Sequence, residues 1–370
     1  MSKYLLGCWL VIALAVFIYS YGFVDFNLTL SSNPLVNSFV HWSQQLAMFD
    51  RSNSLRVYLG LLLASFALYI MVIRQSHYPR FPWKSVLLLG LIFCLAYPFL
   101  SSDVFKYLFS AKTVLVYHAN PHLVAPQVFE GDLWLRFMRW IHTPSPYGPV
   151  QTALAIPYYL ISFGKFTPML YFYKLDQLFW YGLTIWVLGK LGASVRSRLF
   201  FALNPLILYE WLVNAHNDAP MIALALLALY LARQGRGIWA GVSLLISIGI
   251  KYVTVFFLPA ILLSKKLTLS AIVHWSFVIL FLTPLLYHYS WQYQPWYVTW
   301  LIPFAALTPL TWVRGVTVAY SLGALLRYIP FIQIGLWQGS ARYFAALTFV
   351  PMLLALIYYL LLHFFRRREL

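Results

Sequence analysis

The chain has 370 residues, of which 62% are hydrophobic and 9% are charged. Soluble domains carry roughly 25% charged residues, so the composition excludes an ordinary soluble protein and indicates a chain surrounded by lipid. We attribute the net charge of +17 to lysine and arginine at the cytoplasmic ends of membrane helices rather than to nucleic-acid binding. The two cysteines, Cys8 and Cys94, both lie in apolar runs and predict neither a disulfide framework nor a metal site.

Apolar runs of helical length follow one another from end to end of the chain. They predict an all-α, polytopic transmembrane protein, with residues 1–370 forming one domain of about twelve crossings and residues 1–84 forming its N-terminal helices. The runs lie near 4–22, 55–73, 85–101, 148–163, 172–189, 199–214, 220–233, 238–263, 269–288, 298–312, 315–330 and 343–364.

Clusters of positive charge predict which side of the membrane each connection occupies. The clusters at 74–84, 190–198, 232–237 and 264–266 and the final "RRREL" are typical of the cytoplasmic face. They stay on one side only if run 238–263 is a hairpin of two short helices that turns near Lys251, and if run 148–163 is a re-entrant or surface segment that does not cross completely. A large loop at 102–147 then shares the outer face with the stretches 213–220 and 290–298.

The nine acidic residues are the natural candidates for chemistry. Asp103 directly follows an apolar run in "SSDVFKYLF", where it either caps a short outer helix or takes a proton from a hydroxyl as a general base. Glu210 lies in "NPLILYEWLVNA", within or near the membrane, where an ionisable group usually faces a cavity or a partner. Asp218 either caps the helix that begins there or forms a small polar site with His216 and Asn217.

Basic and aromatic residues offer sites for an anion and a sugar. Lys251, at the predicted hairpin turn, either binds a phosphate or extends its ammonium group to the outer interface, and Arg327 and Arg342 are second candidates on the same face. The aromatic side chains of "QPWYVTW" (294–300) either stack on a sugar or polyprenol or belong to an interfacial belt.

Several familiar motifs are missing from the sequence. No metal-binding constellation stands out, and the chain contains neither an Asp-x-Asp nor a Gly-rich loop followed by Lys-Ser/Thr. We therefore expect no metal and no cofactor, and a nucleotide sugar is an unsuitable donor.

The motifs taken in order resemble a known family. "SSDVFKYLFSAKTVLVYHANPH" (101–122) resembles the Asp-x-(Tyr/Phe)-(Arg/Lys)-Tyr and Asn-Pro segment of the integral-membrane GT-C glycosyltransferases, above all the polyprenol-phosphate-mannose-dependent mannosyltransferases. "PYGP" (146–149), "NPLILYEWLVNAHNDAP" (204–220), "GIKYVTVFFLP" (249–259) and "QPWYVTWLIP" (294–303) are similar to later motifs of that group. The likeness covers residues 85 to 312, with Lys112 where arginine is usual and His122 where tyrosine is common.

The resemblance implies an inverting membrane glycosyltransferase at the outer face of the plasma membrane. It would move a sugar, mannose by resemblance, from a polyprenyl-phosphate donor to a hydroxyl of a glycolipid or glycan, with Asp103 as general base and membrane lipids, not nucleic acid, as its other partners. The phosphate would be bound by Lys251, Arg327 and Arg342. The expected substrate-binding residues are Lys106, Tyr107, Lys112, Asn120, Tyr147, Glu210, His216, Asn217, Asp218, Trp296 and Tyr297.

Two other functions remain open at the level of sequence. A lipid-linked sugar flippase or secondary transporter would also use broken helices and charges within the membrane, but no internal repeat is evident and the loop at 102–147 better suits a reaction chamber. A non-catalytic subunit of another membrane enzyme would tolerate alanine at the outer polar residues.

Overall fold

The computed structural model describes all residues except 1–2, 25–31, 76–77, 287–292, 337–339 and 367–370. Parts of the predicted clusters 74–84 and "RRREL", and of the outer stretch 290–298, therefore lie outside the described residues. The described part of the chain is helical and contains no strand. Its longer elements are α1 (Lys3–Tyr21), α2 (Pro34–Leu46), α3 (Arg51–Arg74), α4 (Trp83–Leu95), α5 (Asp103–Leu115), α6 (Pro149–Ile161), α7 (Phe166–Lys190), α8 (Val195–Ala202), α10 (Asp218–Arg233), α11 (Gly237–Ile250), α13 (Leu269–Leu286), α16 (Thr311–Leu326) and α18 (Ala341–Arg366).

Short helices connect these longer ones. Three are 3₁₀-helices, η2 (Pro126–Val128), η3 (Leu133–Phe137) and η5 (Tyr252–Phe257), and η4 (Leu208–Val213) is a π-helix. The remaining short elements are α9 (Pro205–Ile207), α12 (Leu258–Leu262), α14 (Pro295–Thr299), α15 (Ile302–Leu307) and α17 (Ile329–Ile334).

Fewer helices are long enough to cross a membrane than the sequence predicts. Within the described residues, five candidates have the length and apolar composition of a span: α1, α3, α13, the stretch Thr311–Ile334 and α18. A sixth is counted if Pro205–Val213 and Asp218–Arg233, which meet at 111°, form one bent span. Several of the twelve runs form shorter or broken helices. Run 148–163, which was predicted not to cross completely, is the 13-residue helix α6, about 20 Å long against a hydrocarbon core of about 30 Å.

Run 238–263 folds as the predicted hairpin. Helix α11 ends at Ile250, Lys251 is extended with φ −151° and ψ 120°, and η5 and α12 then lead back. The returning segment comes back to the end of α10, where Arg233 Nη1 donates to the carbonyl oxygen of Ser264 at 2.9 Å. The turn therefore places Lys251 at the opposite end of these helices from the basic residues 232–237 and 264–266.

The positive clusters pack against one another in pairs. Arg196 donates to the carbonyl oxygen of Ile73, and the Arg198 guanidinium lies 4.5 Å from the centre of the Phe81 ring. Clusters 74–84 and 190–198 therefore adjoin, as do 232–237 and 264–266.

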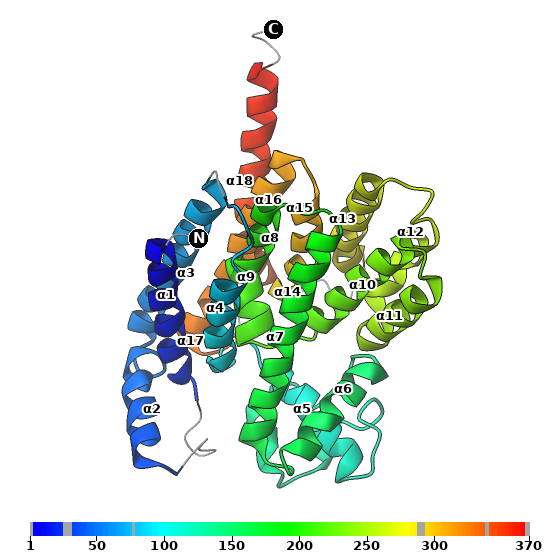
Figure 1. Ribbon diagram of the computed structural model, residues 1–370. Helices are drawn as coiled ribbons and strands as arrows, with labels where there is room; N and C mark the ends of the chain where they lie inside the picture. Colours follow the sequence, from blue (N-terminus) through cyan, green and yellow to red (C-terminus); the bar gives the residue numbers. More distant parts are fainter. Residues whose placement is uncertain (1–2, 25–31, 76–77, 287–292, 337–339, 367–370) are drawn as a thin grey trace.

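Figure 1 shows α5 and α6 together at the far end of the molecule from the C-terminus. The predicted loop 102–147 is thus partly helical: it contains α5, η2 and η3, and α5 packs on α6.

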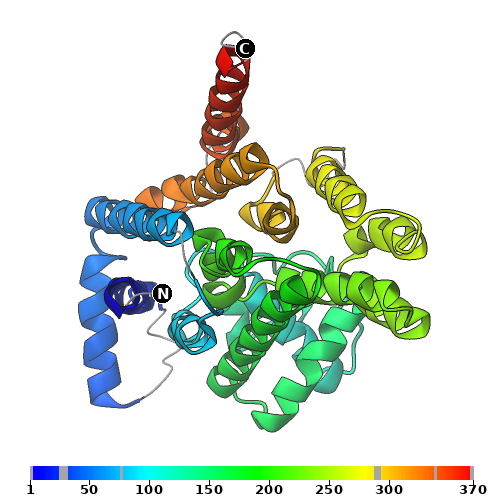
Figure 2. The ribbon, with the colours of Figure 1, turned by 45° about the horizontal axis from the view of Figure 1, so that its top comes forward.

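Helix α18 packs against α16 and leaves most of its surface uncovered. Only 11% of its most apolar stretch is buried, and Figures 1 and 2 show the helix projecting from the molecule on the side of α16. Its exposed face is apolar, with Leu354 and Leu360 both about 60% exposed. An apolar surface of this kind suits contact with lipid.

Candidate active site

The sharp bend between η4 and α10 brings polar side chains into the interior. Widening of the helix to a π-helix at 208–213, followed by Ala215 with φ +57°, turns the chain back on itself. Lys174 of α7, itself fully buried, stabilises this bend by donating to the carbonyl oxygens of Leu212, at 2.8 Å, and Val213. Non-glycine residues at positive φ and π-helical turns concentrate at functional sites, so the bend marks a site candidate.

Asp103 is the first residue of α5 and its carboxylate faces that bend. The residue is 6% exposed, and the Tyr147 hydroxyl donates to Asp103 Oδ2 at 2.8 Å. Its backbone N–H is bound by Ser101 Oγ at 3.3 Å, while Ser102, the N-cap residue, makes no side-chain capping bond. The side chain of Asp103 therefore does not cap its own helix, and its carboxylate faces other groups instead.

His216 lies among three carboxylates contributed by three elements. Its Nε2 is 3.2 Å from Glu210 Oε2, and its Nδ1 is 3.9 Å from both Asp103 Oδ2 and Asp218 Oδ2. The imidazole stacks on the indole of Trp296, with ring centres 4.3 Å apart. His216, Glu210 and Asp218 are all fully buried.

Hydrogen bonds hold the two deeper carboxylates. Glu210 Oε1 accepts from the Tyr328 hydroxyl at 2.8 Å, and its Oε2 accepts from Asn214 Nδ2 at 3.2 Å. Asp218 Oδ1 accepts from Lys251 Nζ at 2.8 Å and from the indole N–H of Trp300. Asp218 thus forms an ion pair across the hairpin turn and makes no side-chain cap for α10.

Two cavities meet at Asp103. The larger, of about 1030 Å³, is lined by Asp103, Tyr147 and Lys251 and by apolar side chains such as Val255 and Phe256. The smaller, of about 250 Å³, is lined by Asp103 together with Ser101, Ser102, Arg139, Gln294, Arg327 and residues of α18. Asp103, Trp140, Gln294 and Trp296 line both cavities.

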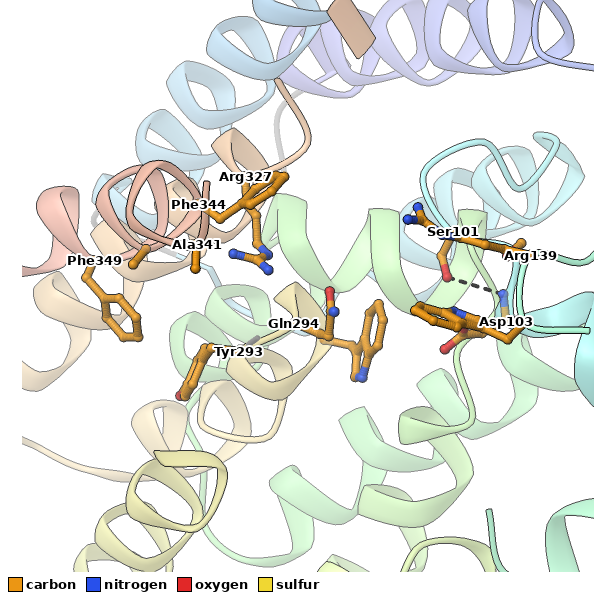
Figure 3. Close-up of a pocket in the computed structure, with 13 residues that line it drawn as sticks. Ser101, Asp103, Arg139, Tyr293, Gln294, Arg327, Ala341, Phe344 and Phe349 are labelled. Atoms are coloured by element: carbon orange, nitrogen blue, oxygen red, sulfur yellow. Dashed lines mark hydrogen bonds between the residues drawn. The ribbon is translucent and has the colours of Figure 1, made fainter. Parts of the chain in front are cut away.

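Figure 3 shows how the smaller cavity is arranged. Arg327 and Gln294 lie on one side of it, and Asp103 and Arg139 lie on the other. Arg327 is 6% exposed, its guanidinium lies 4.6 Å from the Phe344 ring, and its Nε has no hydrogen-bond partner among the described residues.

Lys106 lies one turn after Asp103 and lines the larger cavity. Its ammonium group donates to the carbonyl oxygens of Trp140, at 3.0 Å, and Thr143, at 2.8 Å, and to the Thr143 hydroxyl at 3.0 Å. Burial lowers the pKa of Lys106 to about 8, although the Asp103 carboxylate acts in the opposite direction.

The expected site residues fall into three groups. Those that line a cavity are Asp103, Lys106, Tyr147, Lys251, Trp296, Tyr297 and Arg327. Those that are buried behind the cavities are Tyr107, Glu210, His216, Asn217 and Asp218, with the Tyr107 hydroxyl donating to Asn217 Oδ1 at 3.3 Å. Those that line neither cavity are Lys112, Asn120 and Arg342.

The third group has other surroundings. Lys112 Nζ forms an ion pair with Asp132 Oδ2 at 2.6 Å and lies 4.5 Å from the centre of the Trp134 ring. Burial alone would raise the pKa of Asp132, but Lys112 and other hydrogen-bond donors outweigh it and lower that pKa. Asn120 is exposed and accepts from the backbone N–H of His122 at 2.9 Å, and Arg342 is exposed near the start of α18. The expected roles of these residues at a substrate find no support in their positions.

Sequence reasoning missed several residues of the site. Trp300 lies four residues after Trp296, which was predicted, and this helical spacing was available as a signal that Trp300 faces the site as well. Lys174 interrupts an apolar run, which is the ordinary mark of a functional or structural charge within a membrane. Arg139, Trp140, Gln294 and Tyr328 carried no signal beyond their residue types.

The arrangement suits proton abstraction beside a bound anion. A partly buried carboxylate lies where two cavities join, and cationic groups line each cavity. Among the residues that the structure describes, no group of three His, Cys, Asp or Glu side chains is placed to hold a metal ion.

Comparison with known proteins gives one match. Residues 5–266 match the model of a family described as "Alpha-(1->6)-mannopyranosyltransferase, N-terminal domain". Neither a curated protein nor a solved structure matches the chain. The matched residues include Asp103, Tyr147, His216 and Lys251, but not Trp296 or Arg327.

Proposed function

This chain belongs to the alpha-(1->6)-mannopyranosyltransferase family, and on that premise we propose that it transfers mannose from a polyprenyl-phosphate donor to a hydroxyl of a glycolipid or glycan. Membership supports a glycosyltransferase that uses mannose and acts on a sugar donor and a glycan acceptor. The lipid-phosphate donor, the inverting mechanism and the roles of individual residues are our proposal.

The observation that carries the proposal is the position of Asp103 at the junction of the two cavities. A glycosyl transfer needs a donor and an acceptor that approach one base from different directions. The larger cavity has room and apolar walls for the first isoprene units of a polyprenol, and Lys251 lies where the phosphate would follow. The smaller cavity, with Trp140 and Trp296 at its junction with the larger one, suits a sugar acceptor.

In the proposed reaction, the acceptor oxygen attacks the anomeric carbon while its proton passes to Asp103. The new carbon–oxygen bond forms as the bond from the anomeric carbon to the phosphate oxygen breaks, and the electron pair leaves with the polyprenyl phosphate. Attack opposite the leaving group inverts the anomeric configuration. A positioned base contributes about 10²–10⁴ in rate, and a donor to the developing charge on the leaving group contributes about 10²–10³ by analogy with an oxyanion hole.

Lys251 is our first choice for the donor phosphate and Arg327 our second. Lys251 uses one of its three N–H groups on Asp218, which leaves two for an anion in the larger cavity. Arg327 lines the smaller cavity and reaches the reaction from the other side of Asp103.

We further propose that the chain spans the plasma membrane several times with this site on the extracytoplasmic side. The support is the pairing of the positive clusters 74–84 with 190–198 and 232–237 with 264–266, together with the hairpin that places Lys251 away from them. To test the side, the exposed Asn120 is replaced by cysteine and intact cells are treated with a membrane-impermeant maleimide. Labelling only after cell lysis would contradict this placement.

The activity itself is tested with purified protein, radiolabelled polyprenyl-phosphate-mannose and a membrane glycolipid extract. We expect labelled mannose in glycolipid that α-mannosidase releases. A flippase would instead carry a fluorescent lipid-linked sugar across a vesicle membrane without forming a mannosylated product, and that result would overturn the assignment.

A further inference from the structure

Glu210 and His216 are buried beside Asp103, and the reaction proposed above does not use them. Neither residue lines either of the two cavities at Asp103, and both are fully buried. The substrate-binding role expected of them from the sequence therefore stays a prediction, and their burial calls for another account. A buried glutamate and histidine in contact still need a physical reason for their presence.

Counting the charges around His216 identifies that reason. Asp103, Glu210 and Asp218 contribute three negative charges, and Lys251 supplies one positive charge through its ion pair with Asp218. A neutral His216 would leave the fully buried Glu210 with no cation in contact among the described residues, whereas Asp103 borders the cavities that Lys106 and Arg139 also line. Buried charges are tolerated when they are paired, so the cluster favours an imidazolium that compensates one more carboxylate.

We propose that His216 is a positively charged positioning residue, which Glu210 keeps protonated and which holds Asp103 in its carboxylate form ready to accept a proton. The proposal rests on the proposed function only in that Asp103 is the base. Its geometric support is the 3.2 Å contact of His216 with Glu210 and the 3.9 Å separation of His216 from Asp103.

The same distances separate this role from proton transfer. Hydrogen bonds of this kind span about 2.7–3.2 Å, so 3.9 Å between His216 Nδ1 and Asp103 Oδ2 permits attraction between charges but no direct relay. The proton taken from the acceptor therefore stays on Asp103 until water in the cavity removes it. His216 remains protonated throughout.

Carboxylates and one indole ring surround the His216 imidazole and hold it in place. Asp103 of α5, Glu210 of η4 and Asp218 of α10 face its nitrogens, and Trp296 of α14 covers its ring. Glu210 is fixed in turn by the Tyr328 and Asn214 bonds described above. The other charged groups near the cluster are Lys106, Arg139, Arg327 and Lys251, which line the cavities at Asp103 or contact Asp218.

The kinetic test uses His216→Gln, Glu210→Gln and the double variant. His216→Gln removes a positive charge 3.9 Å from the Asp103 carboxylate, so we expect the acid limb of the kcat profile to move to higher pH in this variant. Near pH 7, kcat should fall roughly 10- to 100-fold while the KM for donor stays within about twofold, because neither residue touches substrate. Glu210→Gln should move the acid limb in the same direction. The double variant should lower kcat by no more than His216→Gln does alone.

Asp176→Asn is the matched control, because Asp176 is a partly buried carboxylate of α7 bonded to the Trp180 indole and lines neither cavity. It should keep the kcat profile of the unmodified protein. Variants of His216 and Glu210 that lose kcat without any movement of the acid limb would show a merely structural role and overturn the proposal.

A second readout needs no turnover and separates this proposal from the transferase assignment. In ¹⁵N-histidine-labelled protein reconstituted in lipid, an imidazolium signal should be present at pH 7, vanish in His216→Gln and convert to neutral imidazole in Glu210→Gln. A neutral His216 in the unmodified protein at pH 7 would overturn the positioning role even if mannose is transferred. Absence of transfer with the imidazolium present would overturn only the proposed function.

Discussion

The ion pair between Lys251 and Asp218 should have two separable effects, one on stability and one on donor binding. Lys251→Met removes the ammonium group 2.8 Å from Asp218 Oδ1 and leaves a fully buried carboxylate with the Trp300 indole as its hydrogen-bond donor. Breaking a buried pair costs about 3–5 kcal/mol. Because the Lys251 side chain is 16% exposed and the Trp300 hydrogen bond remains, we expect the free energy of unfolding to fall by about 3 kcal/mol, the lower end of this range.

The double variant Asp218→Asn/Lys251→Met separates the two effects. A neutral amide no longer needs a cation, so most of the lost stability should return, whereas affinity for polyprenyl-phosphate-mannose should stay reduced. Stability is followed by intrinsic tryptophan fluorescence during denaturation in detergent, and affinity by equilibrium binding of radiolabelled donor. A single variant as stable as the unmodified protein, or a double variant that binds donor normally, would refute the reasoning.

Three further predictions concern the surroundings of Asp103. Tyr147→Phe removes a hydrogen bond to a carboxylate, worth about 1.5–3 kcal/mol, and should lower kcat roughly 10- to 150-fold in a transfer assay; an unchanged kcat would count against the site. Gly148→Ala places a Cβ atom in steric clash with the carbonyl oxygen of Gly249 and should lower the melting temperature, whereas Gly7→Ala, with no atom within 4 Å, should not. The charge of Lys106 is lost as pH rises through about 8, well below its usual 10.5, because burial favours the neutral amine. If that charge supports turnover, activity falls above pH 8 and Lys106→Arg, which stays charged, moves the fall to higher pH; coincident profiles would contradict this.

Much of the architecture was readable from charge and hydropathy. The positive-inside pattern required a turn near Lys251, and the structure has one, so a residue 148 positions after Asp103 could be placed in the same site. The predicted count of about twelve crossings was too high, because most apolar runs were taken as complete spans and the described residues contain five or six helices of that length. Hydropathy does not reveal that run 199–214 breaks into α8, α9 and a π-helix, because that break depends on tertiary contacts such as those of Lys174.

The inner part of the site was harder to predict. Adjacent polar residues in "HND" were predicted to bind substrate, and this stays a prediction; the bend at Ala215 places them inside the protein, which their sequence did not indicate. A sequence gives residue types and spacing, and it does not say whether a carboxylate meets a ligand or a buried partner such as Tyr328. Lys112 illustrates the same limit, since its partner Asp132 lies twenty residues further along the chain.

Asp103→Asn tests the central claim most directly. In purified protein given radiolabelled polyprenyl-phosphate-mannose and acceptor glycolipid under single-turnover conditions, the account predicts that donor binds as in the unmodified protein while the rate of mannose transfer falls by about 10²–10⁴. Transfer by the asparagine variant at a rate within a few-fold of the unmodified protein would contradict the assignment of Asp103 as the base.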